Sequence, residues 1–282
     1  MTIARAYGRV GLLGNPSDAY IEGAKVISFT IDRQAEVEIN SVDRENGDVG
    51  PLELRIEGNG IIEDLKLRAG DDGIIEYNLQ HNKGGEVKAH DLIKATFNCV
   101  RPGLSLKKRV DIKYRTEIPV GLGLAGSSAI VIATLRALSR HVGPHLDNYF
   151  IAEYATDIEN YNLEIAAGFQ DRYAISFEGI RYMDFEGKHP MRKEDKMMHP
   201  VNRRINVNEI PFFLALSNVP KSSATVHNPV RERLLHGSPE EQRDIRSTME
   251  EIALLAEVGE NYVSEMKWKK VGILMNINHK LR

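Results

Sequence analysis

The sequence is poor in cysteine and has no long apolar run. Cys99 is the single cysteine among 282 residues, which excludes an internal disulfide and a thiolate metal cluster. No apolar stretch approaches the roughly 20 residues of a membrane-spanning helix. Residues 1–8 contain no apolar core of a secretory signal peptide. We therefore expect a cytoplasmic protein without a membrane partner.

The sequence also lacks an excess of charge of either sign. The 37 Lys and Arg residues nearly balance the 40 Asp and Glu residues, so the net charge is −3. This balance argues against nucleic acid or an anionic membrane as a partner. Hydrophobic residues make up 42% and charged residues 27%, as in ordinary globular proteins. The length allows two domains or one large one.

The most informative stretch is a glycine-rich loop at residues 117–129. Apolar and polar residues alternate over 110–115, which predicts a half-buried strand, and Pro119 ends its hydrogen-bond ladder. Gly121, Gly123 and Gly126 follow and allow the main chain to approach a ligand closely. The apolar spacing of residues 130–138 predicts a helix directly afterwards.

A strand, a glycine loop and a helix start together predict an anion site. Unpaired N–H groups and the positive end of the helix dipole meet there, and the Ser127 and Ser128 hydroxyls can bind a phosphate or its metal. The structural alternative is a turn that only packs the helix onto a sheet. A P-loop is excluded because no Gly-Lys-Ser/Thr follows. The glycines also match a dinucleotide fingerprint, but residues 139–147 form a break before another helix instead of the required second strand.

Four further residues are candidates for chemistry. Arg9 precedes a short apolar strand and could face solvent or a cleft. Asp18 ends the turn 14–18, where it could be a turn residue or bind a substrate hydroxyl. Asp171 follows Gly168, but taken alone it is also an N-cap or a partner for Arg172. Glu159 would by default be an exposed helix residue. A pair of carboxylates is also compatible with a glycosidase. The phosphate loop argues against that function, because a hydrolase does not need to bind a nucleotide.

Two apparent metal motifs are set aside. Asp71 and Asp72 lack the twelve-residue EF-hand pattern and are interpreted as a turn. His141 and His145 are four residues apart but are separated by Gly143-Pro144, so a zinc pair is not expected.

The remaining pattern predicts an α+β protein. Alternating runs separated by turn residues predict an antiparallel sheet over 26–106, with a helix over 86–100. A helix capped by Asp147 should reach about residue 161, and a strand should follow at 179–185. Residues 187–208 are expected to cross between domains, 210–216 to form an apolar strand, 218–227 a polar loop and 229–235 a short helix. The sequence from Ser238 to Glu241 predicts a capped helix start.

With these residues in view, the chain resembles the sugar kinases of the GHMP superfamily. Three segments carry the resemblance: residues 8–18, residues 119–129 and residues 168–171. The resemblance implies a two-domain α+β fold, with a ribosomal S5 domain 2-like N-terminal domain over 1–187 and an α/β C-terminal domain over 205–282. The family's third glycine-rich motif has no counterpart here, so we expect the C-terminal domain to be incomplete.

Residues 14–18, 126–131, 170–172, 183–185, 226–233 and 274–276 make the chain look most like the glucuronokinase family within the superfamily. That resemblance implies transfer of the γ-phosphoryl group of ATP to the anomeric hydroxyl of glucuronate, with Mg²⁺. It assigns the catalytic roles to Asp171 and Arg9, the metal to Ser128 and Glu159, and sugar hydroxyls to Asp18. Arg172, Lys221 and Ser223 are the candidates for the sugar carboxylate. The nucleotide site would contain Pro119, Gly121, Gly123, Leu124, Ala125, Gly126, Ser127 and Ser128.

Three alternatives stay open. The chain could phosphorylate another sugar, of the fucose, galactose or heptose type. It could be a non-catalytic remnant that only binds nucleotide or sugar. A nicotinamide-dependent oxidoreductase would need a strand after the phosphate-loop helix, which the sequence does not predict. The oligomeric state is not predicted.

Overall fold

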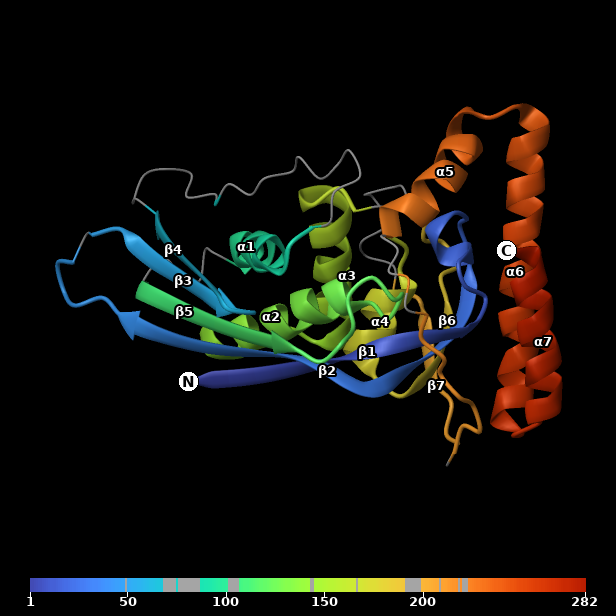
Figure 1. Cartoon of the computed structure of the whole chain (residues 1–282), viewed down its shortest axis with the longest axis horizontal. Coiled ribbons are helices and arrows are strands. Elements are labelled where there is room, and N and C mark those ends of the chain that lie inside the picture. The colour runs from blue at the N-terminus through green and yellow to red at the C-terminus, as the bar shows by residue number, and fades with distance from the viewer. Residues whose placement is uncertain are drawn as a thin grey trace. The chain divides into compact units, whose positions relative to one another are not determined.

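The computed structural model describes residues 1–48, 50–67, 75, 87–100, 107–142, 145–165, 167–190, 199–207, 209–217, 219 and 223–282. The chain forms two compact units (Figure 1). Unit 1 comprises residues 1–8, 32–119 and 125–165, and unit 2 comprises residues 9–31, 120–124 and 166–282. The domain division at 187 and 205 stays a prediction.

The sheet of unit 1 is built from strands with alternating burial. It contains the second half of β2 (Lys25–Asp43), β3 (Leu52–Gly58), β4 (Ile61–Leu67) and β5 (Lys107–Thr116). β5 pairs antiparallel with β2, with Ile39 opposite Ile112, and parallel with β3, with Ile56 opposite Ile112. β3 also pairs antiparallel with β4. The side chains of Ile39, Ile56 and Ile112 have no exposed area, so this face of the sheet is the core of unit 1.

Helices complete unit 1. These are α1 (Ala89–Val100), α2 (Gly126–Val142) and α3 (Asn148–Asp157), which a π-helical turn at Ile158–Asn162 follows. α1 and α3 both pack against α2 (Figure 1). The predicted cap of α3 is confirmed, because the Asp147 carboxylate accepts a hydrogen bond from the Phe150 N–H at 2.9 Å.

Unit 2 contains a second group of strands. β1 (Thr2–Leu13) enters it at Arg9, and the first half of β2 pairs antiparallel with β6 (Ile180–Asp184). β6 pairs antiparallel with β7 (Val201–Arg204). A short 3₁₀ turn, Ser17–Ala19, lies between β1 and β2 and carries Asp18.

The described residues of unit 2 form four α-helices: α4 (Gln170–Phe177), α5 (Ser223–His236), α6 (Pro239–Ser264) and α7 (Trp268–Leu281). α6 begins with the predicted capping box, in which Ser238 and Glu241 each bond the other's main-chain N–H. α6 and α7 pack side by side (Figure 1). The apolar sides of α6 and α7 pack against the end of β1 and the start of β2. The core between them is formed by residues that include Leu13, Ile27, Ala256, Val263 and Leu274.

Three expectations for the elements are corrected. Residues 26–31 and 35–39 are parts of one strand, β2, which pairs with β6 over residues 25–29 and with β5 over residues 35–43. Residues 223–227 are the first turn of α5, although a loop was expected there. Residues 209–217 lie in no strand, although their composition is that of a buried one. The predicted turn at Asp71 and Asp72 lies outside the described residues.

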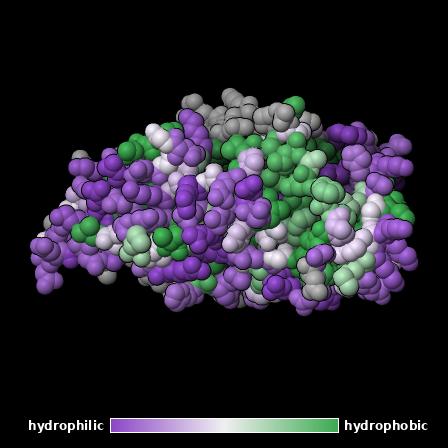
Figure 2. Space-filling view, turned by 60° about the horizontal axis from the view of Figure 1, so that its bottom comes forward, coloured by the Kyte–Doolittle hydropathy of each residue, from purple (hydrophilic) through white to green (hydrophobic). Residues whose placement is uncertain are grey.

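The segment 209–217 leaves apolar side chains in contact with solvent. Phe213 is fully exposed, and Leu214 and Leu216 are each exposed by nearly half. Figure 2 shows hydrophobic residues gathered on part of the visible surface, among polar ones. Within the described part of the chain, no helix combines the length and the apolar character that a membrane span requires.

Candidate functional site

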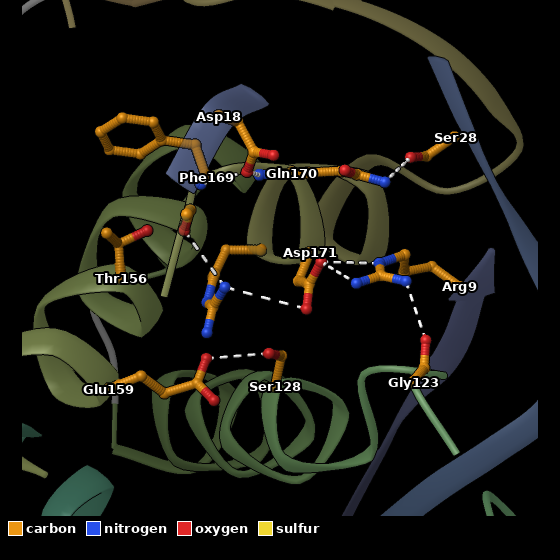
Figure 3. A network of polar contacts seen from close by, with 12 residues as sticks. Arg9, Asp18, Ser28, Gly123, Ser128, Thr156, Glu159, Phe169, Gln170 and Asp171 are labelled. Atoms are coloured by element: carbon orange, nitrogen blue, oxygen red, sulfur yellow. Dashed lines mark hydrogen bonds and ion pairs between the residues drawn. The ribbon is translucent and has the colours of Figure 1, made fainter. Parts of the chain in front are cut away.

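Arg9 joins the glycine loop to Asp171 within unit 2. It lies on β1, and its Nε donates a hydrogen bond to Oδ1 of Asp171 at 2.6 Å, while Nη2 contacts the same oxygen (Figure 3). Nη1 donates to the Gly123 carbonyl at 3.0 Å, and the Arg9 main-chain N–H donates to the Leu124 carbonyl at 3.1 Å. One guanidinium therefore fixes the predicted acidic residue beside residues 123–124 of the loop.

The surroundings of Asp171 keep its carboxylate charged. Burial would raise its pKa, but the neighbouring Arg9 and Arg172 guanidinium groups outweigh burial and lower the pKa below its usual value. Arg172 is itself almost fully buried; its Nη1 donates to the Gly168 carbonyl at 3.1 Å and lies 3.9 Å from Oδ2 of Asp171. Asp171 is therefore an ionised, hydrogen-bond-accepting group.

Asp18 anchors the start of the helix that carries Asp171. Its Oδ2 accepts hydrogen bonds from the main-chain N–H groups of Phe169 and Gln170, both at 2.8 Å (Figure 3). A Cβ on Gly168 would lie 2.1 Å from that oxygen, so the approach requires glycine. Burial raises the pKa of Asp18, the Gln170 hydrogen bond opposes the rise, and the nearby Asp171 charge adds to it.

The Gln170 side chain extends this polar network. Its Oε1 accepts from Asn15 Nδ2 at 2.8 Å, and its Nε2 donates to Ser28 Oγ at 2.5 Å. A Cβ on Gly11 would lie 2.6 Å from Nε2. The strand β2, the turn at residues 14–18 and α4 are thus held together by side-chain hydrogen bonds of Gln170, which fix the start of the helix that carries Asp171.

The loop backbone has the unusual conformation that the glycines predict. Gly121 and Gly123 have φ values of 71° and 74°, and Ala125, a residue with a Cβ, also has a positive φ of 58°. The Ala125 carbonyl accepts from the Ala129 N–H at 3.0 Å, so α2 begins directly after it. The N–H groups of the first turn of α2, which includes Ser127 and Ser128, have no acceptor within the helix. This is the backbone arrangement that binds phosphate.

Within unit 1, Ser128 and Glu159 form a hydrogen-bonded pair of oxygen-bearing side chains. Both side chains are fully buried, and Ser128 Oγ donates to Glu159 Oε2 at 2.8 Å (Figure 3). The interpretation of Glu159 as an ordinary exposed helix residue is therefore wrong. A carboxylate and a hydroxyl suit Mg²⁺, which takes one or two carboxylates and completes its shell with phosphate oxygens and water. Among the described residues no group of three or more His, Cys, Asp or Glu side chains could hold a metal by itself.

Other predicted residues have different outcomes. Lys221 and the side chain of Ser223 lie outside the described residues, so their assignment to the sugar carboxylate stays a prediction. Pro119 and Gly126 lie at the two ends of the loop, and a Cβ on Gly126 would meet Ile118 at 3.4 Å. His141 Nδ1 is 2.9 Å from Thr2 Oγ1 and its Nε2 is 2.7 Å from Ser41 Oγ, which accounts for both ring nitrogens without a metal.

Two contacts near the first turn were not predicted. Asn278 of α7 accepts from the Gly14 N–H at 2.8 Å and donates to the Asn15 carbonyl at 3.0 Å. Tyr20 Oη lies 2.6 Å from His227 Nδ1 of α5. Both join residues more than 200 positions apart, and no short-range pattern signals either contact, since His227 was expected in a polar loop.

Comparisons with known proteins show which sequences and folds this chain resembles. Residues 91–179 match the family model of the GHMP kinases N terminal domain. Glucuronokinase 1 of Arabidopsis thaliana is 31% identical and probable glucuronokinase 2 of the same plant is 32% identical; each alignment spans 99% of this chain and 73% or 72% of the relative. A D-glycero-D-manno-heptose 1-phosphate kinase structure from Bacteroides thetaiotaomicron has a similar fold, with a TM-score of 0.65 at 20% identity, over all of this chain and 79% of the other.

Proposed function

This chain belongs to the GHMP kinase family and is an ATP-dependent kinase, and we propose that it transfers the γ-phosphoryl group of ATP to the anomeric hydroxyl of glucuronate. The product would be glucuronate 1-phosphate. The curated names of two relatives that align with 99% of the chain support glucuronate over the other sugars. The fold of the heptose kinase supports the kinase architecture and says nothing about the sugar.

The contact of Arg9 with both Asp171 and Gly123 carries the proposal. Phosphoryl transfer needs an acceptor hydroxyl and a phosphate held side by side, with positive charge near the group in transit. Asp171 supplies an acceptor for the hydroxyl proton, and Gly123 belongs to the proposed phosphate loop. Arg9 touches both, so its charge is available where negative charge develops on the transferred group.

Asp171 then acts on the sugar hydroxyl in its ionised form. It accepts a hydrogen bond from the anomeric O–H and orients one lone pair toward the γ-phosphorus. As the new O–P bond forms and the bond to the β-phosphate oxygen breaks, the hydroxyl proton passes to Asp171. Its lowered pKa makes it a weak base, which suits a transition state in which the proton leaves late. Asp18 would bind a further sugar hydroxyl through its Oδ1.

The nucleotide would bind to the loop and to the start of α2. Main-chain N–H groups from Gly123 to Ser127 would donate to its phosphate oxygens, aided by the helix dipole. Pro119, Gly121, Leu124, Ala125 and Gly126 shape that loop. Ser128 and Glu159 would hold Mg²⁺, which when bound neutralises charge on the phosphates.

A substrate panel tests the proposed reaction. Purified full-length chain is incubated with Mg-ATP and one of glucuronate, galacturonate, glucose, galactose, fucose or a heptose, and ADP is measured against a reaction without sugar. ³¹P NMR of the product then locates the phosphate. We expect glucuronate to be preferred and the product to carry an anomeric phosphate. Phosphorylation of neutral sugars alone would refute the glucuronate assignment, and nucleotide binding without turnover would favour a non-catalytic role.

A further inference from the structure

The helices α6 and α7 carry apolar side chains on the side that faces away from the core of unit 2. On α6, Leu254 and Val258 are 55% and 47% exposed, and they lie on one side of the helix because they are four residues apart. On α7, Ile273 and Ile277 have the same spacing and are 59% and 40% exposed. The buried Ala256 is two residues from both Leu254 and Val258, which puts it about 200° around α6, on the opposite side. Each helix therefore presents two apolar side chains to solvent.

The two exposed pairs lie beside each other. α6 and α7 pack side by side (Figure 1), and a Cβ on Gly259 of α6 would lie 3.5 Å from a methyl group of Leu274 on α7. Further along the pair, Lys270 Nζ lies 4.8 Å from the centre of the Tyr262 ring. These two contacts define an antiparallel register, in which residues 254 and 258 lie within one turn of residues 273 and 277. One apolar surface results, which we call the outer patch: Leu254, Val258, Ile273 and Ile277.

The two helices differ in charge. α6 contains seven acidic and two basic residues, for a net charge of −5. α7 contains three lysines and no acidic residue, for a net charge of +3 with its histidine counted as neutral. Three acidic side chains of α6 form ion pairs within the chain, at Glu241, Glu257 and Glu260. The other four and both arginines are exposed. The unpaired charges of α6 are therefore still negative in sum, whereas those of α7 are all positive.

An acidic and a basic residue flank the outer patch at the same end. Glu251 precedes Leu254 by one turn on α6, and Lys280 follows Ile277 by one turn on α7, so each lies on the exposed side of its helix. In the antiparallel register the two residues lie at nearly the same level along the helix axes. Within the part of the chain that the structure describes, neither one forms an ion pair. Both charges are therefore available to a partner.

A surface of this kind is complementary to itself. A two-fold axis parallel to the helices lays α6 of one copy over α7 of the other. Leu254 and Val258 then face the apolar residues of α7 in the second copy, and Glu251 faces the second copy's Lys280. The two-fold axis repeats both contacts, with the roles of the copies exchanged. Burial of the apolar centre provides affinity, and the opposite charges select this orientation.

We propose that the outer patch binds a second copy of this chain, in a two-fold dimer in which α6 of each copy packs against α7 of the other. The complementarity of the patch to itself favours this occupant over an unrelated protein. No residue of the outer patch belongs to the proposed active site. The dimer therefore forms whether or not the chain phosphorylates glucuronate.

Sedimentation velocity of the full chain over a range of concentrations tests the dimer. The wild type should pass from monomer to dimer as its concentration rises. Ile273→Glu should weaken the dimer more than about 100-fold, because it buries a carboxylate in the apolar centre. Glu251→Lys and Lys280→Glu should each weaken it about 3- to 30-fold, since each opposes like charges at both contacts. Glu240→Lys is the matched control: it is exposed on α6 but lies about 21 Å along the helix axis from Leu254.

A mixture of the two charge variants tests the pairing itself. Equimolar Glu251→Lys and Lys280→Glu proteins bring opposite charges together at both contacts, so their heterodimer should form with about the wild-type affinity. A mixture that associates no more tightly than its components overturns the inference. A wild type that stays monomeric, or a dimer that Ile273→Glu leaves intact, also overturns it. Thermal melting checks the fold of each variant, and if the Ile273 variant does not fold, Leu254→Glu is read by the same criteria.

Discussion

Arg9 and Asp171 form an ion pair in which Arg9 Nε lies 2.6 Å from Asp171 Oδ1, and the same guanidinium reaches the Gly123 carbonyl. The two side chains are shielded from solvent, with 12% and 20% of their area exposed. Arg9 therefore serves two neighbours at once, and changes at either residue should affect the chemistry more than the fold.

Asp171→Asn should abolish phosphoryl transfer while the protein stays folded. Asparagine keeps the shape but cannot take a proton, and loss of a general base lowers kcat about 10²- to 10⁴-fold. ADP release with the preferred sugar measures the effect, and circular dichroism checks the fold. Asp64→Asn is the control, because the Asp64 side chain is exposed. Its ion pair with Arg55 is long, with 3.7 Å between the nitrogen and the oxygen. Turnover of the Asp171 variant at the wild-type rate would remove Asp171 from the proposed role.

Arg9→Met should move the acid limb of the pH–rate profile to higher pH. In the wild type the pKa of Asp171 is lowered, with burial opposed by Arg9 and Arg172. The stability that the ionised Asp171 contributes is therefore present above its unfolded pKa of about 3.9 and is lost as the pH falls through the lower folded value. Without Arg9 that pKa rises, so activity should be lost at a less acidic pH. The prediction would be contradicted if the acid limb of the pH–rate profile did not move and ¹³C NMR showed an unchanged titration of the Asp171 carboxyl group.

Gly168→Ala should destabilise the protein and disturb the site together. The new Cβ would lie 2.1 Å from Asp18 Oδ2 and 3.0 Å from the Ala19 nitrogen, so the turn or α4 must shift, at a cost of about 1–3 kcal/mol. Gly272→Ala is the control, since nothing lies within 4 Å of its Cβ position in α7, and it should stabilise by about 0.5–1 kcal/mol. Urea unfolding measures both; equal stabilities would refute the packing argument.

Ser128→Ala and Glu159→Gln should each raise the Mg²⁺ concentration needed for half-maximal activity. Both oxygens belong to the proposed ligand pair, 2.8 Å apart, and loss of a ligand or its support costs about 10- to 100-fold in metal affinity. Magnesium titration at fixed ATP gives the value. The exposed Glu240→Gln serves as a control. A wild-type magnesium requirement in both site variants would exclude this pair as the metal site.

Asn278→Ala should lower the free energy of unfolding by about 1–3 kcal/mol, because it leaves the buried Gly14 N–H without its acceptor. It should also weaken sugar binding, since the 14–18 turn carries Asp18. Asn276→Ala, at an exposed position two residues earlier, should do neither. Chemical unfolding and sugar titration of the two variants provide the comparison.

The sequence predicted the local features of the site well because each depends on neighbouring residues. The positive φ values at Gly121 and Gly123, the start of α2 after the loop and the cap at Ser238 all follow from short-range backbone chemistry. Ala125 shows the limit of that reasoning. Its φ of 58° is unusual for a residue with a Cβ, and only the surrounding loop imposes it.

Long-range partners could not be predicted in the same way. The apolar composition of residues 210–216 indicates a buried strand, yet strand formation needs a neighbour to pair with, and composition does not supply one. The polar residues at 223–227 were expected to form a loop. They form the first turn of α5 instead, and His227 contacts Tyr20 from this helix. The family resemblance, by contrast, is confirmed, since it rests on three motifs in a fixed order.

The hydrogen bond between Gly14 and Asn278 has a consequence for biosynthesis. The ribosome makes the two residues 264 positions apart, so a nascent chain exposes the amide of Gly14 long before its acceptor exists. The turn that carries Asp18 therefore reaches its final form only after α7 has left the exit tunnel. A growing polypeptide that has already completed its glycine loop would still lack the finished turn that carries Asp18, and maturation of the kinase would coincide with the end of translation of α7.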